Sequence, residues 1–306
     1  MAYARTVPAP VEIVDHARKG QLFVALGAVA WSTAGLLQRD LSLGTATQLA
    51  GRALFALVSL LAFVAISRPD GGMVASFRRV GRAGLVTAGC MAVASSTFLI
   101  ALNHTSVAHV LFILALAPLV AALLARVALG ERVSAQTWVA MLIALVGVVV
   151  MLGGGGGGGL LGDGLAIVTM LAFAASIVIT RHQREISMAP ASCISQLLVL
   201  LLALPFAHPG SAGARDVVLL VLLGAGQIAL GLALMTTGAR LIPAAQTALI
   251  GLLEVVLGPI WVWLAYAEQP GTATLVGGAI VVVGIVVQTG NLGRLAPSRA
   301  AVEPHP

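Results

Sequence analysis

The chain contains an internal repeat made of apolar segments that are long enough to cross a bilayer. Residues 108–145 and 245–282 align at a constant offset of 137 residues, which is the separation of Glu131 from Glu268. Membrane transporters built from two similar halves usually place the substrate path where the halves meet, near the bilayer midplane. The repeat therefore indicates a membrane protein with a substrate path before any single side chain is considered.

The composition requires most of the chain to lie in lipid. Hydrophobic residues make up 59% of the 306 residues and charged residues 9%, whereas a soluble domain carries about 25% charged residues. Lipid offers the backbone no hydrogen-bond partners, so such segments are expected to be α-helices. Residues 107–129 lack the polar and apolar alternation of a membrane β-barrel. We expect an all-α polytopic membrane protein.

Ten segments are candidates for transmembrane helices, each of which needs about 20 apolar residues. They cover residues 21–37, 43–66, 82–102, 106–128, 134–152, 160–180, 190–206, 216–237, 243–266 and 271–289. Five crossings per half is an odd number, so the second half starts on the opposite side of the membrane from the first. We therefore expect two inverted five-helix repeats around a central cavity, the arrangement associated with alternating access.

The chain divides into five parts. These are a cytoplasmic N-terminal segment (1–20), the first repeat (21–152), a glycine linker (153–159), the second repeat (160–289) and a cytoplasmic C-terminal tail (290–306). The glycine run contains the pattern GxGxxG, but it follows no strand and precedes no Lys-Ser or Lys-Thr pair. A flexible linker is therefore favoured over a phosphate-binding loop.

Basic residues predict the orientation, because cytoplasmic loops are enriched in Lys and Arg. With both termini inside, 14 of the 17 basic residues fall on the cytoplasmic side: Arg5, Arg18, Lys19, Arg68, Arg78, Arg79, Arg82, Arg126, Arg132, Arg181, Arg184, Arg240, Arg294 and Arg299. We expect a multi-pass protein of the cell inner membrane. The net charge of +6 fits an anionic leaflet better than a nucleic-acid partner.

The sequence does not indicate a cofactor or a metal site. Cys90 and Cys193 lie in apolar segments, and the six His residues show no zinc-type spacing. There is also no ATP-binding motif, so transport would draw its energy from gradients. Glycines at 147, 277, 278 and 284 predict close packing of the fifth and tenth helices.

The pattern resembles the drug/metabolite transporter superfamily, in its ten-helix EamA-type branch. The resemblance is carried by Trp31-Ser32, Gly51-Arg52, Ala117-Pro118, Leu129-Gly130-Glu131-Arg132, Leu253-Glu254 and Ala267-Glu268. Within that family the chain looks most like bacterial exporters of aromatic amino acids. The resemblance implies export of amino acids or related metabolites. Val255 stands where the family often has Pro, so whether this chain has the associated kink is left open.

Glu254 is the acidic residue placed deepest in the apolar segments. It shares one helical face with Thr247, Gly251, Gly258 and Trp261. Intramembrane polar groups usually face the bundle interior or a wet cavity. This face is therefore predicted to wall a cavity, with Glu254 binding a substrate ammonium or a proton. The alternatives are a carboxyl kept neutral by burial, or one bonded to a neighbouring helix end.

Two further candidates for binding the substrate are Arg52 in the second crossing and Trp31 in the first crossing. Arg52 can hold a substrate carboxylate bidentately, but it can also tie its helix to backbone carbonyls or pair with Glu254, and the structural role is favoured. Trp31 shares a face with Gln38 and lies deeper than a headgroup anchor, so it can stack on a planar or cationic solute. Core packing is the alternative for Trp31.

The remaining candidates are weaker. Thr169, Phe173 and Ser176 form a stripe in the sixth crossing that resembles the stripe of the first, although hydroxyls bonding their own helix would explain it too. His109 and Gln246 align in the repeat, each about one turn from the inner end of its helix, which suggests an inner gate or vestibule. Further cavity candidates are Thr97, Phe98, Gln227 and Met235.

These observations predict a secondary transporter of small organic solutes, in which two five-helix halves rock around a cavity walled by helices 1, 3, 4, 6, 8 and 9. The alternatives are a broad drug or cation efflux pump and, less favoured, a membrane-embedded enzyme acting on lipid. Such an enzyme would need a nucleophile beside a base, or clustered carboxylates, and the deep segments contain neither. The expected partners are a solute and the lipid bilayer, and the choice between monomer and homo-oligomer is open.

Overall fold

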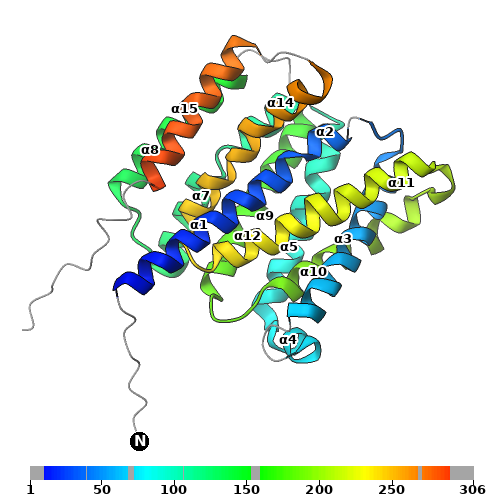
Figure 1. The fold of residues 1–306 in the computed structure, drawn as a ribbon, viewed down its shortest axis with the longest axis horizontal. Coiled ribbons are helices and arrows are strands. Elements are labelled where there is room, and N and C mark those ends of the chain that lie inside the picture. Colours follow the sequence, from blue (N-terminus) through cyan, green and yellow to red (C-terminus); the bar gives the residue numbers. More distant parts are fainter. Residues whose placement is uncertain are drawn as a thin grey trace, which may run out of the picture.

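The computed structural model describes residues 10–38, 40–67, 72–105, 107–152, 159–267 and 271–289, and this part of the chain is helical without strands (Figure 1). The α-helices are α1 (Pro10–Ser32), α2 (Ala34–Gln38), α3 (Thr45–Ser67), α4 (Met73–Arg79), α5 (Gly81–Leu102), α6 (Val107–Leu114), α7 (Ala117–Leu129), α8 (Ala135–Leu152), α9 (Leu160–His182), α10 (Ala189–Ala203), α11 (Ala214–Val221), α12 (Leu230–Ala239), α13 (Ala244–Gly251), α14 (Leu253–Tyr266) and α15 (Thr272–Thr289). A π-helical segment, η4 (Leu222–Ala229), joins α11 to α12, and two 3-10 turns, η2 (Leu204–Phe206) and η3 (Pro209–Ser211), follow α10.

Eight helical segments of the described chain are long and apolar enough to cross a membrane. Two shorter apolar helices, α7 and α8, lie in the regions predicted as the fourth and fifth crossings. The prediction of an all-helical fold is confirmed for the described residues, and their long apolar helices fit a polytopic membrane protein. The count of ten crossings and the inversion of the repeats stay predictions, and most of the glycine linker and the C-terminal tail lie outside the described residues.

Two helical segments are broken at equivalent places in the repeat. The break between α6 and α7 falls at Ala115 and Leu116, and the break between α13 and α14 falls at Leu252. Leu252 aligns with Ala115 in the repeat register. Pro118 lies in the first turn of α7, where its missing N–H costs little, but the aligned residue in α14 is Val255. The helix therefore breaks in the second half without a proline at that position.

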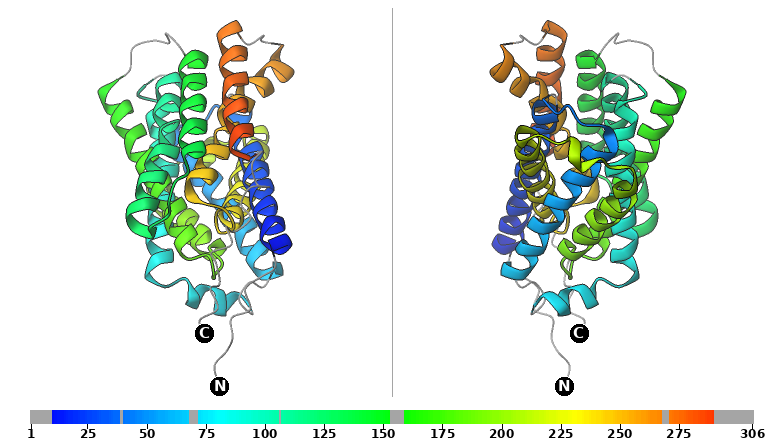
Figure 2. Two further views of the ribbon diagram at one scale, coloured as in Figure 1. Left: turned by 90° about the vertical axis from the view of Figure 1, so that its left-hand side faces the viewer. Right: turned by 90° about the vertical axis from the view of Figure 1, so that its right-hand side faces the viewer.

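Helices from the two sequence halves interleave. Helices α5, α6, α7 and α9 pack together as bundle A, and α1, α12, α13 and α14 pack together as bundle B. Figure 2 shows the two bundles on opposite sides of the molecule, while α8 packs along α15 at one edge (Figure 1). The expectation that each sequence half forms its own rocking unit is wrong, because helices in lipid associate wherever small residues allow close approach.

Glycines account for the closest of these contacts. A Cβ on Gly147 would lie 2.7 Å from the Gly277 carbonyl oxygen, and one on Gly284 would lie 2.8 Å from the Ala140 carbonyl oxygen. The predicted glycine-mediated packing of α8 against α15 is thus confirmed at these positions. In bundle B, a Cβ on Gly27 would lie 3.3 Å from the Gly231 carbonyl oxygen, so small residues also bring α1 onto α12.

The two ends of the molecule are packed differently. We call the end where α9 begins the upper end and the end where it finishes the lower end, as in Figure 2. In the lower half α7 packs on α13, which brings bundle A against bundle B. In the upper half α6 and α14, which continue the same two crossings, make no comparable contact with each other. Among the described residues, the bundles are therefore in closer contact below than above.

Candidate functional site

A cavity lies between bundles A and B near the middle of the helices. Its empty volume is about 980 Å³, including space open to solvent, which is at the upper end of the range of about 300–1,000 Å³ for small-molecule sites. The walls are mostly apolar. The largest apolar side chains that line it are Trp31, Met91, Phe98, Phe173 and Met235.

An aromatic pair joins the two sides of the cavity. The ring centroids of Trp31 in bundle B and Phe173 in bundle A lie 5.6 Å apart, with the planes at 60°, an edge-to-face geometry that is favourable for aromatic rings. The Trp31 indole lies against Gly231, where a Cβ would overlap it. The structure places both rings in the cavity wall, and their part in binding a solute stays a prediction.

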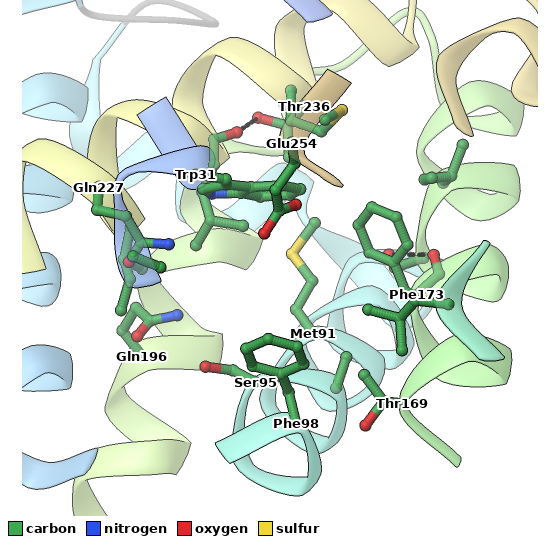
Figure 3. A pocket seen from close by; sticks show the side chains of 18 of the residues that line it. Trp31, Met91, Ser95, Phe98, Thr169, Phe173, Gln196, Gln227, Thr236 and Glu254 are labelled. Atoms are coloured by element: carbon green, nitrogen blue, oxygen red, sulfur yellow. Dashed lines mark hydrogen bonds between the residues drawn. The ribbon is translucent and has the colours of Figure 1, made fainter. Parts of the chain in front are cut away.

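Glu254 enters the cavity at the break between α13 and α14. It is the second residue of α14, where the helix dipole favours a negative charge, and Figure 3 shows its carboxyl group pointing into the cavity. No hydrogen bond or ion pair joins it to another described residue. Within the described chain it is therefore not bonded to the end of a neighbouring helix, which was one of the alternatives to a binding role.

Arg52 lines the same cavity from α3 and is 5% exposed. Its Nη1 donates to Gln38 Oε1 over 3.4 Å, and Gln38 Nε2 donates to Gln48 Oε1 over 3.1 Å. Gln48 Nε2 in turn donates to the Leu43 carbonyl oxygen over 2.7 Å. Arg52 makes no ion pair with Glu254, and its Nε is buried without a partner. Gln38 therefore supports Arg52 rather than lining the cavity.

Two buried amides complete the polar part of the wall. Gln196 on α10 is 1% exposed and Gln227 on η4 is 8% exposed, and Oε1 of each has no hydrogen-bond partner. A buried group left in this way costs about 1–3 kcal/mol. Gln227 was among the weaker sequence candidates, whereas Gln196 was missed. The available signal was an isolated amide within the apolar α10 segment.

Several predicted residues hold the walls together. Thr97 Oγ1 on α5 and Thr169 Oγ1 on α9 lie 2.7 Å apart, and of the two only Thr169 is part of the cavity lining. Trp261 Nε1 donates to Ser32 Oγ over 2.7 Å, which ties α14 to α1 away from the cavity. Ser176 lines the cavity and donates to the carbonyl oxygen of its own helix, as the structural alternative expected.

The proposed inner gate of His109 and Gln246 is wrong as a matched pair. His109 follows Thr105, whose hydroxyl donates to Asp163 at the upper end of α9. Gln246 follows Arg240, whose carbonyl oxygen accepts from Arg181 at the lower end of α9. The two positions therefore lie toward opposite ends of α9, so the two side chains do not share one gate. The His109 side chain lies outside the described residues, and Gln246 does not line the cavity.

Polar contacts tie the chain together at the lower end. Arg181 Nε forms an ion pair with Glu131 Oε1 over 3.0 Å, and its Nη1 donates to the Arg240 carbonyl oxygen over 2.7 Å. Arg240 Nε donates to the Arg184 carbonyl oxygen over 2.8 Å. These bonds connect the residue after α7 with the end of α9 and the turn before α13. They therefore reinforce the contact between the two bundles on this side.

Comparisons with known proteins agree with this architecture. A crystal structure of a protein that is 19% identical superposes with a TM-score of 0.77 and covers 90% of this chain and 98% of its own; at that identity the likeness concerns the fold alone. No curated protein sequence matches the chain. The model of the EamA-like transporter family matches residues 18–153 and again residues 160–289. The chain therefore belongs to the EamA-like transporter family and is a multi-pass membrane protein.

Proposed function

We propose that the chain is a secondary transporter that exports small organic solutes, with aromatic or neutral amino acids as the substrate class. The observation that carries the proposal is the cavity between the bundles. It combines aromatic and thioether walls with one unpaired carboxyl group, Glu254, and one guanidinium, Arg52. An amino acid is a zwitterion with an apolar side chain, and each of its parts has a complementary group there.

Alternating access is supported by the difference between the two ends. The bundles are in contact through α7 and α13 below, and the described parts of their counterparts α6 and α14 make no comparable contact above. The helix pairing also supports inverted repeats. In bundle B, α1 of the first half packs on α12 of the second half, and in bundle A, α9 of the second half packs on α5 of the first half. Each pair therefore becomes the other when the two halves are exchanged. A rocking of bundle A against bundle B would close the upper end and open the lower end.

The distribution of charge supports an inner-membrane location with the lower end in the cytoplasm. Among the described basic residues, all except Arg52 and Arg215 lie at or near lower helix ends. This asymmetry is the one expected for cytoplasmic loops. The cavity would then be open to the outside and closed to the cytoplasm in this conformation.

Counterflow of labelled phenylalanine, tryptophan and leucine into proteoliposomes tests the proposed substrate class. We expect uptake by the wild-type protein and a loss of more than about tenfold in Trp31→Ala, which removes an aromatic wall worth a few kcal/mol. The unpaired Glu254 would also suit a pump for organic cations. Transport of tetraphenylphosphonium with no transport of any amino acid would favour that function and contradict ours.

Proton coupling through Glu254 is part of the proposal. A membrane-buried carboxyl facing a wet cavity can bind either a proton or a cation. We expect Glu254→Gln to retain some exchange of labelled for unlabelled substrate but to lose concentrative transport driven by a pH gradient. Full pH-driven accumulation by this variant would show that the proton travels elsewhere.

A further inference from the structure

The lining of the cavity contains three buried polar side chains with unfilled hydrogen-bonding capacity. Arg52, Gln196 and Gln227 are each at least nine-tenths buried. The unpartnered atom is the donor Nε in Arg52 and the acceptor Oε1 in each glutamine. They come from α3, α10 and η4, and α3 packs on both of the other elements. Figure 3 shows the two amides on one side of the cavity, with Glu254 reaching into it from another.

We infer that Arg52, Gln196 and Gln227 form a subsite for the carboxylate group of the substrate, separate from an ammonium subsite at Glu254. A guanidinium can only donate hydrogen bonds, and an amide can turn its NH2 group toward an anion. The contact of Arg52 with Gln38 is a single long bond to a neutral oxygen. A carboxylate would give this buried cation a charged, bidentate partner.

The chain of amides behind Arg52 gives it a fixed position. Gln38 and Gln48 connect its guanidinium to the Leu43 carbonyl oxygen between α2 and α3, near the upper end. Gln48 does not line the cavity. It is therefore a positioning residue, and its loss should weaken carboxylate binding without changing the binding of amines.

This inference rests on the proposed function and narrows it to solutes that carry both charges. An amine without a carboxylate would bring no partner for the buried guanidinium and would add a second positive charge to the cavity. The carboxylate subsite therefore predicts discrimination against decarboxylated amino acids, whereas a cavity for organic cations would prefer them.

Three probes of matched shape separate the two subsites. Phenylalanine carries both charges, 3-phenylpropionate only the carboxylate and phenethylamine only the ammonium. Binding of each is measured by thermal shift and isothermal calorimetry on the purified full chain in detergent. We expect the double variant Gln196→Leu/Gln227→Leu to lose about tenfold or more in affinity for phenylalanine and 3-phenylpropionate, because hydrogen bonds to a charged group are lost. Its affinity for phenethylamine should stay unchanged.

The chain offers a matched control in Gln288 on α15. This amide is 6% exposed and also has an unpartnered Oε1, but it does not line the cavity. Gln288→Leu should bind all three probes as the wild type does. Gln48→Leu should weaken the two carboxylates about threefold, with phenethylamine unaffected, and Glu254→Gln should weaken phenylalanine and phenethylamine while sparing 3-phenylpropionate.

Two results would overturn the subsite. The first is an unchanged affinity for phenylalanine and 3-phenylpropionate in the folded double variant. The second is a failure of 3-phenylpropionate to compete with phenylalanine for the wild-type protein, a test that does not require the double variant to fold. Counterflow separates failure of the subsite from failure of the proposed function. Phenylalanine transport combined with either result would contradict the carboxylate subsite but not amino-acid export. Transport of phenethylamine without transport of phenylalanine would contradict both the subsite and amino-acid export.

Discussion

The lower and upper halves of the two broken crossings behave differently although they belong to equivalent parts of the repeat. Below, α7 and α13 share a buried cluster of small residues that includes Ala121, Ala125, Ala244 and Ala248. Above, the described parts of α6 and α14 make no comparable contact with each other, and most of α14 is only partly buried. The two contacts are therefore not equivalent in this structure, although the segments that would make them align in the repeat.

The comparison also shows where the two crossings are divided. The breaks at Ala115 and Leu252 lie near the cavity, so each crossing is divided into an upper and a lower piece close to it. In the proposed rocking motion, one piece of each crossing would change partner while the other stays in its own bundle. Glu254 lies within two residues of one break, so its carboxyl group lies beside the point where the helix is divided.

Locking the lower contact should have the largest effect. In a Cys90→Ala/Cys193→Ala background, cysteines at Ala121 and Ala248 lie in one buried cluster, so oxidation should join α7 to α13. We expect counterflow to fall by more than about tenfold and to recover with a reducing agent, because the lower end could no longer open. Undiminished transport by protein shown to be cross-linked would contradict the rocking of the bundles.

The register-equivalent pair, Leu111 and Gly258, probes the upper half. Cysteines at these positions on α6 and α14 should cross-link poorly in this conformation and readily in the opposite one. Comparing the two pairs with and without substrate would show whether the contacts exchange. Efficient cross-linking of both pairs under the same condition would argue against exchange.

Filling the space beside Trp31 should have the next largest effect. A methyl group at Gly231 would overlap the indole, and overpacking of this kind costs about 1–3 kcal/mol. Gly231→Ala should lower the thermal unfolding temperature and weaken phenylalanine binding in the same measurement. Gly226→Ala is the control, because a Cβ there would meet nothing within 4 Å. Equal behaviour of the two variants would show that bundle B does not fix Trp31.

Removing Arg181 should loosen the lower end moderately. Arg181→Gln loses the ion pair with Glu131 and the bond to the Arg240 carbonyl oxygen, together about 1 kcal/mol, or roughly fivefold in population. A cysteine at Ala239, 1% exposed beside the cavity, should react about fivefold faster with an impermeant maleimide applied from the lower side. Arg184→Gln, which keeps the backbone carbonyl, is the matched control and should not change this rate.

The smallest expected effect is at the upper end of bundle B. Trp261→Phe removes the hydrogen bond to Ser32 Oγ, and interhelical hydrogen bonds in membranes average about 0.6 kcal/mol. We expect a fall of a degree or two in unfolding temperature and normal transport. A loss of transport comparable to that of the lower cross-link would mean that α14 does not stay with α1 during the cycle.

Much of the fold could be predicted because a chain that crosses lipid must form helices of a set length. Bilayer thickness sets the length of each apolar segment, so the long helices lie where the sequence places them. The interleaving of the halves could not be predicted, because it depends on which small residues meet across helices distant in sequence. The break at Leu252 was left open because the usual signal, a proline at Val255, is missing.

Some residues of the site could be predicted from the sequence and others could not. Intramembrane charge and aromatic side chains are conspicuous in an apolar segment, and nine of the candidates line the cavity: Trp31, Arg52, Phe98, Thr169, Phe173, Ser176, Gln227, Met235 and Glu254. Gln196 is just as buried but has no helical stripe around it. The gate at His109 and Gln246 failed because alignment gives equivalence within the repeat and not the same side of the membrane.

Paired spin labels measured by double electron–electron resonance in lipid nanodiscs test the central claim most directly. Exposed positions Leu161 on α9 and Leu264 on α14 report on the upper separation of the bundles, and exposed Val127 on α7 and Arg18 on α1 report on the lower one. We predict a shorter upper distance and a longer lower distance in a new population as phenylalanine is added. Distances that both shorten, both lengthen or both stay fixed would contradict a transporter that rocks two interleaved bundles around a shared cavity.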